Sequence, residues 1–235
     1  MKIKNVLVGG LAIAASCLMS VSALAVPGGG GGGGGCSVTE VSPFGSSTTF
    51  FVPSGGSGTY AILGWGNGTG GTVGSYDGML EAAAEQCVLV AAAETSSSGN
   101  GRDVRDAINE AKSRYASIVG SNPIVCTSGH SQGGGGSFNA ANLVDADCVI
   151  AVQPDTVFTT RIDRPVSRST DVVCIFTSGD TLAPAFPSNG ANCRRNSPGT
   201  YIQESGSGTH FAPNSGTGGD PGRFQREYIN LWMVD

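Results

Sequence analysis

The sequence has few lysines and histidines, and this scarcity narrows the functions that it can support. Lys112 is the only lysine after the first five residues. The chain carries 13 basic and 18 acidic residues, a formal net charge of −5. Because no basic stripe is present, we expect no nucleic-acid partner. The two histidines, His130 and His210, have no partner at a metal-ligand spacing, so we expect neither a metal nor a cofactor.

Long apolar runs are also missing, so no membrane span is expected. The apolar run 6–15 is too short for one, but it follows two lysines and precedes the small residues Ala23-Leu24-Ala25. This order predicts a secretory signal peptide over residues 1–25. Lipoprotein processing at Cys17 is the less favoured alternative, because Ala14 stands where Leu is usual. We therefore expect a protein secreted to the extracellular space or the periplasm.

The remainder divides into a glycine-rich spacer, 26–35, and a single folded domain, 36–235. Six cysteines follow the signal peptide, an even number that permits three disulfides in an oxidising compartment. Buried free thiols are an equal alternative for the cysteines inside apolar runs. The pairing stays open, because six cysteines allow about 15 connectivities. The six are Cys36, Cys87, Cys126, Cys148, Cys174 and Cys193.

Strand-like and helix-like segments alternate along this domain, which predicts an α/β fold. The strands are expected to be apolar throughout, as in a mostly parallel sheet with helices on both faces. Functional residues in such sheets lie just after the carboxyl ends of strands. The expected strands are 48–52, 60–63, 87–93, 123–126, 148–152, 172–176 and 200–203, and the expected helices are 75–85, 101–118, 137–143 and 221–233.

One serine lies in the pattern Gly-x-Ser-x-Gly, which is typical of a nucleophile on a tight strand-to-helix turn. The segment is Gly129-His130-Ser131-Gln132-Gly133. In so glycine-rich a chain, roughly 0.7 matches are expected by chance, so the context must decide. An expected strand precedes the motif and an expected helix follows it. We therefore interpret Ser131 as a nucleophile, and a structural turn is the alternative.

A serine nucleophile needs a general base and an acid that orients it. His130 adjoins the serine and cannot easily reach its hydroxyl, so His210 is the predicted base. Asp180 follows the expected strand 172–176 and is the predicted acid. Asp155, after the strand 148–152, is its rival, and a turn-capping role is the alternative for Asp180.

The oxyanion of such a reaction is stabilised by two backbone N–H groups. Gln132 is predicted to supply one and Asn67 the other, with Gly68 as the next choice. Trp65 is expected either to line the substrate pocket or to pack in the core. Phe211, beside the predicted base, is a further pocket candidate.

With these motifs, the chain resembles the secreted α/β-hydrolases of the cutinase-like, poly(ethylene terephthalate)-hydrolase and chlorophyllase-like group. The serine motif with its glycines 133–136, the acid loop 178–184 and the histidine loop 208–210 look like those of that group and occur in its order. The resemblance implies an α/β-hydrolase fold without a lid, over 36–235. Gln132 departs from the usual Met, Thr156 replaces the aromatic clamp of the pocket, and the C-terminal cysteine pair is absent.

We expect a serine carboxylic-ester hydrolase that forms an acyl-enzyme, with polyesters among its candidate substrates. We expect it to be a monomer whose activity rises through about pH 6–8, because the base must be neutral. A peptidase or dienelactone-type hydrolase with the same three residues is one alternative. A non-catalytic surface-binding module on a hydrolase scaffold is the other.

Overall fold

The computed structural model describes residues 35–56 and 58–234, which form a single α/β unit around one sheet. The eight strands are β1 (Ser37–Val41), β2 (Thr48–Ser54), β3 (Ala61–Gly66), β4 (Val88–Ala93), β5 (Val125–His130), β6 (Cys148–Val152), β7 (Asp171–Gly179) and β8 (Tyr201–Thr209). The helices are α1 (Asp77–Ala84), α2 (Arg102–Arg114), α3 (Ala116–Val119), α4 (Gln132–Val144), α5 (Gly190–Arg195) and α6 (Gly219–Trp232). Short helical turns occur at Val73–Ser75, Ala185–Asn189 and Ala212–Asn214.

The strands follow the order β1-β2-β4-β3-β5-β6-β7-β8 across the sheet. β1 and β2 pair in antiparallel fashion, β2 is antiparallel to β4, and every later pairing is parallel. The α/β architecture with a mostly parallel sheet is therefore confirmed. Because β3 to β8 all run the same way, their carboxyl ends meet at one edge, which is where ligands bind in such sheets.

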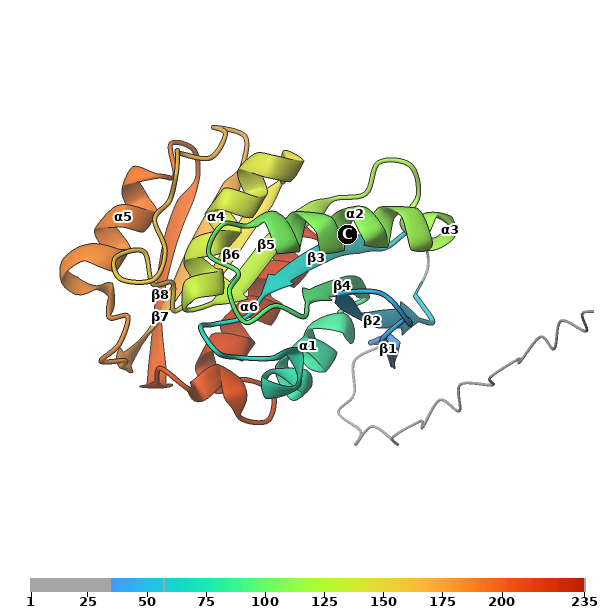
Figure 1. Ribbon diagram of the computed structural model, residues 1–235, viewed down its shortest axis with the longest axis horizontal. Coiled ribbons are helices and arrows are strands. Elements are labelled where there is room, and N and C mark those ends of the chain that lie inside the picture. Colours follow the sequence, from blue (N-terminus) through green and yellow to red (C-terminus); the bar gives the residue numbers. More distant parts are fainter. Residues whose placement is uncertain (1–34, 57, 235) are drawn as a thin grey trace, which may run out of the picture. The chain divides into compact units, whose positions relative to one another are not determined.

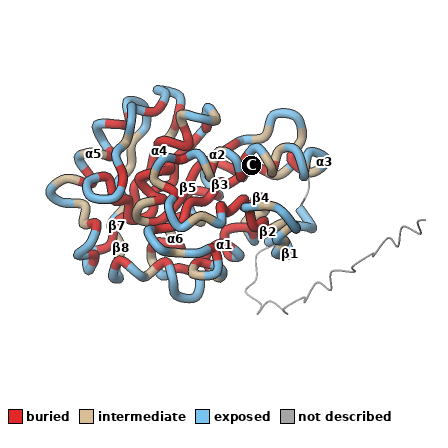
Figure 2. The backbone as a smooth tube through the Cα atoms, viewed as in Figure 1, coloured by how far each residue is buried: buried red, intermediate tan, exposed pale blue. Residues whose placement is uncertain are grey.

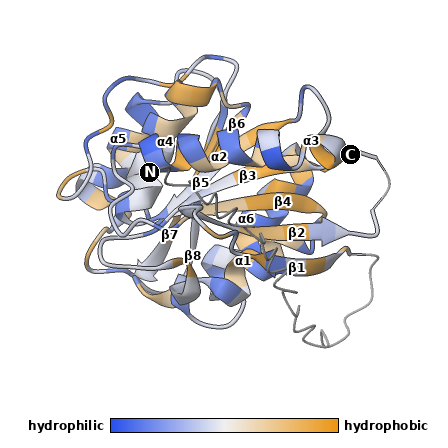
Figure 3. Ribbon diagram, turned by 45° about the vertical axis from the view of Figure 1, so that its right-hand side comes forward, coloured by the Kyte–Doolittle hydropathy of each residue, from blue (hydrophilic) through white to orange (hydrophobic). Residues whose placement is uncertain are grey.

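Helices cover both faces of this sheet, and Figure 1 shows α1 and α6 on one side and α2, α4 and α5 on the other. The central strands β3, β4, β5 and β6 are buried at every position, which Figure 2 shows as a red centre within exposed loops. This explains their continuous apolar sequences. Helix α2, in contrast to these strands, has both hydrophobic and hydrophilic residues along its surface, as Figure 3 shows. Its buried residues are Val104, Ala107, Ile108 and Ala111.

All six cysteines of the domain are paired. The disulfides join Cys36 to Cys87, Cys126 to Cys148 and Cys174 to Cys193. The second one links neighbouring strands, because Cys126 and Cys148 are register partners in β5 and β6. The three disulfides that six cysteines permit are thus all present, and the alternative of buried free thiols in the strands is wrong.

Several expected elements differ from those observed. Strand β6 has the predicted bounds, whereas β7 and β8 extend further, to Gly179 and Thr209. Strand β1 and helix α5 were not expected. Among the described residues, no helix is long and apolar enough to cross a membrane. The signal peptide 1–25, Cys17 and nearly all of the spacer 26–35 lie outside the described residues.

Candidate active site

Ser131 lies on the tight turn between β5 and α4, at the carboxyl edge of the sheet. Its backbone has φ +54° and ψ −116°, a conformation that costs free energy for any residue except glycine. The turn needs very small neighbours, since a Cβ on Gly129 would lie 2.6 Å from the carbonyl oxygen of Gly66. A Cβ on Gly133 would collide with the same oxygen. The two glycines of the motif thus allow β3, β5 and α4 to meet at the serine.

The glycines that follow the motif have a related role, and they correct the expected helix start. Helix α4 begins at Gln132 rather than at residue 137. A Cβ on Gly134 would lie 2.8 Å from the oxygen of Val152, and one on Gly135 would lie 2.6 Å from that of Asp155. A Cβ on Gly136 would collide with the oxygen of Ser98. The first turn of α4 therefore packs directly on three backbone carbonyl groups, which outweighs the poor helix propensity of glycine.

The three residues predicted for catalysis come together at this edge. His210 Nε2 lies 2.9 Å from Ser131 Oγ, and His210 Nδ1 lies 2.8 Å from Asp180 Oδ2. Asp180 follows β7 and His210 follows β8, and the two residues are 5% and 6% exposed. A neutral imidazole with its proton on Nδ1 donates to Asp180 and accepts from the serine hydroxyl. His210 Nε2 is therefore placed to accept the hydroxyl proton of Ser131.

Asp180 combines this contact with a turn-capping one. Its second oxygen, Oδ1, accepts hydrogen bonds from the N–H groups of Leu182 and Ala183, at 2.9 and 2.8 Å. Burial raises the pKa of Asp180, but the hydrogen bonds from His210 and from these N–H groups outweigh it and lower the pKa below its usual value. The carboxylate is therefore charged and faces the imidazole that it would stabilise.

The rival acid lies elsewhere in the hydrogen-bond network. Asp155 accepts hydrogen bonds from the backbone N–H groups of Val157, Phe158 and Thr159, at 2.9 to 3.0 Å, and shapes that loop. It makes no hydrogen bond to His210 among the described residues. Of the two candidate carboxylates, only Asp180 is placed to orient the base.

His130 points away from the Ser131 hydroxyl, as the sequence predicted. Its ring is buried, with Nδ1 2.9 Å from the Tyr76 hydroxyl and Nε2 2.8 Å from the carbonyl oxygen of His210. Burial, followed by repulsion from His210, lowers the pKa of His130 to about 3, so the ring is neutral. Tyr76 was not predicted as a site residue, because nothing in the sequence distinguishes it from an aromatic residue that packs in the core.

The two residues expected to supply the oxyanion N–H groups, Gln132 and Asn67, lie in different surroundings. Gln132 is the first residue of α4, so its N–H has no acceptor within the helix. Asn67 is fully buried and does not line the pocket. Its side chain donates to the carbonyl oxygens of Ala93 and Thr95 and accepts from Trp65 Nε1 at 3.0 Å. Asn67 thus joins the ends of β3 and β4.

The next two residues of this loop, Gly68 and Thr69, do line the pocket. The Gly68 N–H donates to the Tyr76 hydroxyl at 3.2 Å. Among the described residues, the Thr69 N–H has no protein acceptor. Because Thr69 lines the pocket and Asn67 does not, the Thr69 N–H is the better placed of the two to bind a ligand beside Ser131.

A cavity of about 620 Å³ opens over Ser131 and His210. Its outer wall is apolar and exposed, with Phe158 81%, Phe211 62% and Leu182 53% accessible. We call these three residues the apolar rim. Phe211 was expected in the pocket and lies there, with its ring edge-on to that of His210. Sequence reasoning missed Phe158 and Leu182, because the sequence does not show that they are exposed.

Two other residues expected in the pocket lie outside it. Trp65 is fully buried in the core, where it packs edge-on against Tyr76 at 5.1 Å between ring centroids. Its place inside β3 directs the ring to the face covered by α1 and α6. Thr156 is buried as well, and its hydroxyl donates to Asn189 Oδ1 at 2.9 Å. Both expectations for the pocket are corrected, and the packing role applies to Trp65.

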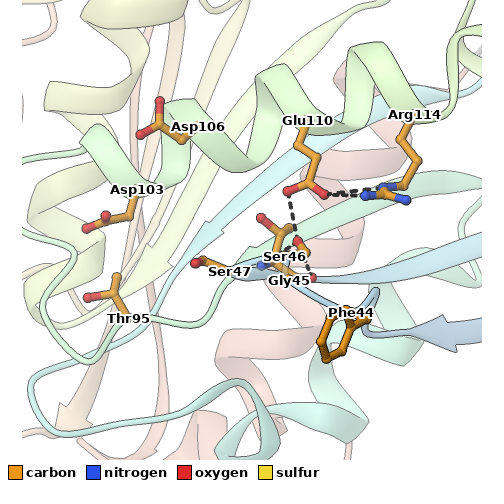
Figure 4. A pocket seen from close by; sticks show the side chains of 10 residues that line it. Phe44, Gly45, Ser46, Ser47, Thr95, Asp103, Asp106, Glu110 and Arg114 are labelled. Carbon is orange, nitrogen blue, oxygen red and sulfur yellow. Dashed lines mark hydrogen bonds and ion pairs between the residues drawn. The ribbon is translucent and has the colours of Figure 1, made fainter. Parts of the chain in front are cut away.

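A second cavity, of about 420 Å³, lies between the start of β2 and α2. Figure 4 shows its acidic side chains Asp103, Asp106 and Glu110 on α2 and the exposed Phe44 across from them. Glu110 accepts hydrogen bonds from Ser46 at 2.8 Å and from Arg114 at 2.9 Å. The Ser46 hydroxyl of this cavity is therefore bonded to a carboxylate, whereas the hydroxyl bonded to an imidazole is that of Ser131, in the first cavity.

No known protein family and no curated protein matches this chain.

Proposed function

We propose that this chain is a secreted serine hydrolase of the α/β-hydrolase fold that cleaves carboxylic esters through an acyl-enzyme. The observation that carries the proposal is the continuous contact from Ser131 Oγ to His210 and on to Asp180, at 2.9 and 2.8 Å. The nucleophile lies on a strained turn between a parallel strand and a helix, as in that fold. The order Ser131, Asp180, His210 along the chain is also that of the α/β-hydrolases.

The reaction follows from these contacts. Ser131 Oγ attacks the ester carbonyl carbon while His210 Nε2 takes the hydroxyl proton, and Asp180 stabilises the resulting imidazolium. The N–H groups of Gln132 and Thr69 stabilise the oxyanion. The carbon–oxygen bond to the alcohol breaks, and His210 returns the proton to the leaving alcohol. A water molecule, deprotonated by His210, then attacks the acyl carbon, and the acid leaves as Ser131 regains its proton.

The test is Ser131→Ala, assayed on p-nitrophenyl butyrate beside the wild-type chain. We expect kcat to fall by at least about 10³-fold, because the variant lacks the attacking oxygen. A fluorophosphonate probe should label the wild-type chain at Ser131 and should not label the variant. Wild-type turnover by the variant would refute the proposal. If the wild-type chain did not react with the probe, the non-catalytic binding module would be the better interpretation.

The exposed side chains of the apolar rim favour the binding of substrates that present an apolar surface, and polyesters are among these. Ester hydrolysis should be measured over an acyl chain-length series and on a polyester emulsion. Amides and lactones belong in the same panel, since a peptidase or dienelactone-type hydrolase would use the same three residues. Faster turnover of an amide or lactone than of every ester would redirect the proposal to one of those classes.

A further inference from the structure

We infer that Tyr76 and His130 form a fixed hydrogen-bonded relay that positions both the oxyanion loop and the catalytic base, His210. The inference rests on the proposed function and names two positioning residues for that same site. Three contacts make up the relay. The Gly68 N–H lies 3.2 Å from Tyr76 Oη, Tyr76 Oη lies 2.9 Å from His130 Nδ1, and His130 Nε2 lies 2.8 Å from the carbonyl oxygen of His210.

The direction of each hydrogen bond follows from the groups involved. A carbonyl oxygen only accepts, so His130 Nε2 carries a proton and donates it to His210. Because the ring is neutral, His130 Nδ1 is then an acceptor, and the Tyr76 hydroxyl must donate to it. The Tyr76 oxygen in turn accepts from the Gly68 N–H. Each of the three hydrogen bonds has only one possible direction, so the relay holds a single tautomer of His130.

The surroundings keep this arrangement unchanged over the working pH range. His130 and Tyr76 are 2% and 3% exposed. Burial, the largest cause, lowers the pKa of His130 to about 3 and also raises the pKa of the Tyr76 hydroxyl. The ring stays neutral and the hydroxyl stays protonated wherever His210 can act as a base. The relay is therefore a fixed structural element and takes no part in the proton transfer.

The relay connects the two loops that carry opposite parts of the proposed chemistry. At one end, Gly68 precedes Thr69, whose N–H is a proposed oxyanion donor. A Cβ on Gly68 would lie 3.1 Å from both Tyr76 Oη and His130 Nδ1, so this loop packs closely against the relay. At the other end, the relay holds the backbone of His210 itself. Small displacements of such groups cost large factors in rate, so the relay is expected to act on kcat.

The first test is Tyr76→Phe in the full chain, with Tyr228→Phe as the matched control. Tyr228 lies on α6, is likewise buried, and donates its hydroxyl proton to Glu204 of β8; neither residue lines the pocket. Without the Tyr76 hydroxyl, His130 Nδ1 loses its donor and Gly68 loses its acceptor. We expect kcat on p-nitrophenyl butyrate to fall about tenfold or more, with KM changed by less than about threefold. Tyr228→Phe should keep wild-type kcat. Equal kcat for both variants would overturn the inference.

A second pair of variants separates the two arms of the relay. The side-chain amide of His130→Gln can place a donor near the position of Nε2 and keep the contact with the His210 carbonyl. The shorter amide of His130→Asn reaches only the position of Nδ1, facing Tyr76. We expect the Gln variant to retain more of kcat than the Asn variant. If the Asn variant retained as much, the contact with the base loop would be dispensable and the inference wrong.

A spectroscopic measurement tests the relay without turnover. The ¹⁵N shifts of His130 in the labelled wild-type chain should report one tautomer, with the proton on Nε2, and no titration from pH 5 to 8. Tyr76→Phe should keep the proton on Nε2, which still donates to the His210 carbonyl, but should shift the Nδ1 resonance, because Nδ1 loses its hydrogen-bond donor. An unchanged Nδ1 shift in that variant would contradict the relay. If Ser131→Ala keeps its activity, the proposed function fails. If Ser131→Ala is inactive but Tyr76→Phe is fully active, only the relay fails.

Discussion

The inner and outer parts of the candidate active site differ in almost every physical respect. The inner part is polar and, apart from the partly exposed Ser131, buried. Hydrogen bonds fix its side chains: Ser131, Asp180, His210, His130 and Tyr76. The apolar rim of Phe158, Leu182 and Phe211 is more than half exposed. No side-chain hydrogen bond is available to hold these three residues. We infer that the inner part determines the reaction, and that the rim determines which esters reach it.

The difference also explains how each part tolerates change. A buried hydrogen-bonded group leaves an unsatisfied partner when it is replaced, which costs about 1–3 kcal/mol or more. An exposed apolar side chain loses contact area only with the substrate. Substitutions in the inner part should therefore act on kcat by large factors, and those in the rim should act on substrate choice by small ones. Three experiments test this contrast, in order of decreasing effect.

Asp180→Asn should have the largest effect. The amide group of Asn can still cap the turn at Leu182 and Ala183, but it cannot accept from His210 Nδ1–H if its nitrogen faces the ring. The imidazole then favours the tautomer that places its proton towards Ser131. We expect kcat to fall by about 10³–10⁴-fold with little change in KM. Asp163→Asn, in the exposed loop after β6, is the control and should keep wild-type activity. A loss of less than about tenfold for Asp180→Asn would assign the orienting role to another group.

The sequence was most informative where one local signal agreed with the tertiary structure. The run 148–152 is apolar and bounded by polar residues, and β6 has those bounds. The three inner residues Ser131, Asp180 and His210 follow expected strands, and the parallel sheet brings those strand ends together. The second acid candidate, Asp155, also follows a strand, so only its hydrogen bonds to the loop 157–159 distinguish it.

Other features could not be predicted, because they depend on contacts between distant segments. Helix α4 starts five residues earlier than expected, since the packing of Gly134 and its neighbours against other backbones outweighs helix propensity. Trp65 lies inside β3, so its ring faces the core rather than the pocket. The relay joins residues 54 and 80 positions apart, and no sequence pattern indicates such a connection.

The pH dependence of stability should show a smaller effect from the inner part. The folded-state pKa of His130, about 3, lies below its ordinary value of 6.5, so the unfolded chain binds more protons as the pH falls. This contribution is complete above about pH 6.5 and is lost progressively towards pH 3. Between pH 7 and pH 5 the loss is about 2 kcal/mol. Urea unfolding at the two pH values measures it.

His130→Gln should remove most of this pH dependence, because its side chain does not titrate. His210→Gln is the matched control and should retain the contribution of His130. Asp180 does not interfere, since its pKa is lowered from an ordinary value of 3.8 and it titrates below this window. If His130→Gln loses as much stability between pH 7 and pH 5 as the wild-type chain does, then His130 is not a neutral buried ring.

Replacement of the rim should have the smallest effect and should depend on the substrate. Phe158→Ser removes an 81% exposed ring from the wall of the cavity without breaking a hydrogen bond. We expect the rate on a polyester emulsion to fall about threefold to tenfold, because partial burial of one aromatic ring on the substrate is worth about 0.7–1.4 kcal/mol. On p-nitrophenyl butyrate, kcat should change by less than about twofold. Phe44→Ser, which removes a still more exposed ring at the second cavity, is the control and should leave both rates unchanged. Equal losses on the two substrates would mean that Phe158 supports the inner part, and the division between reaction and substrate choice would have to be redrawn.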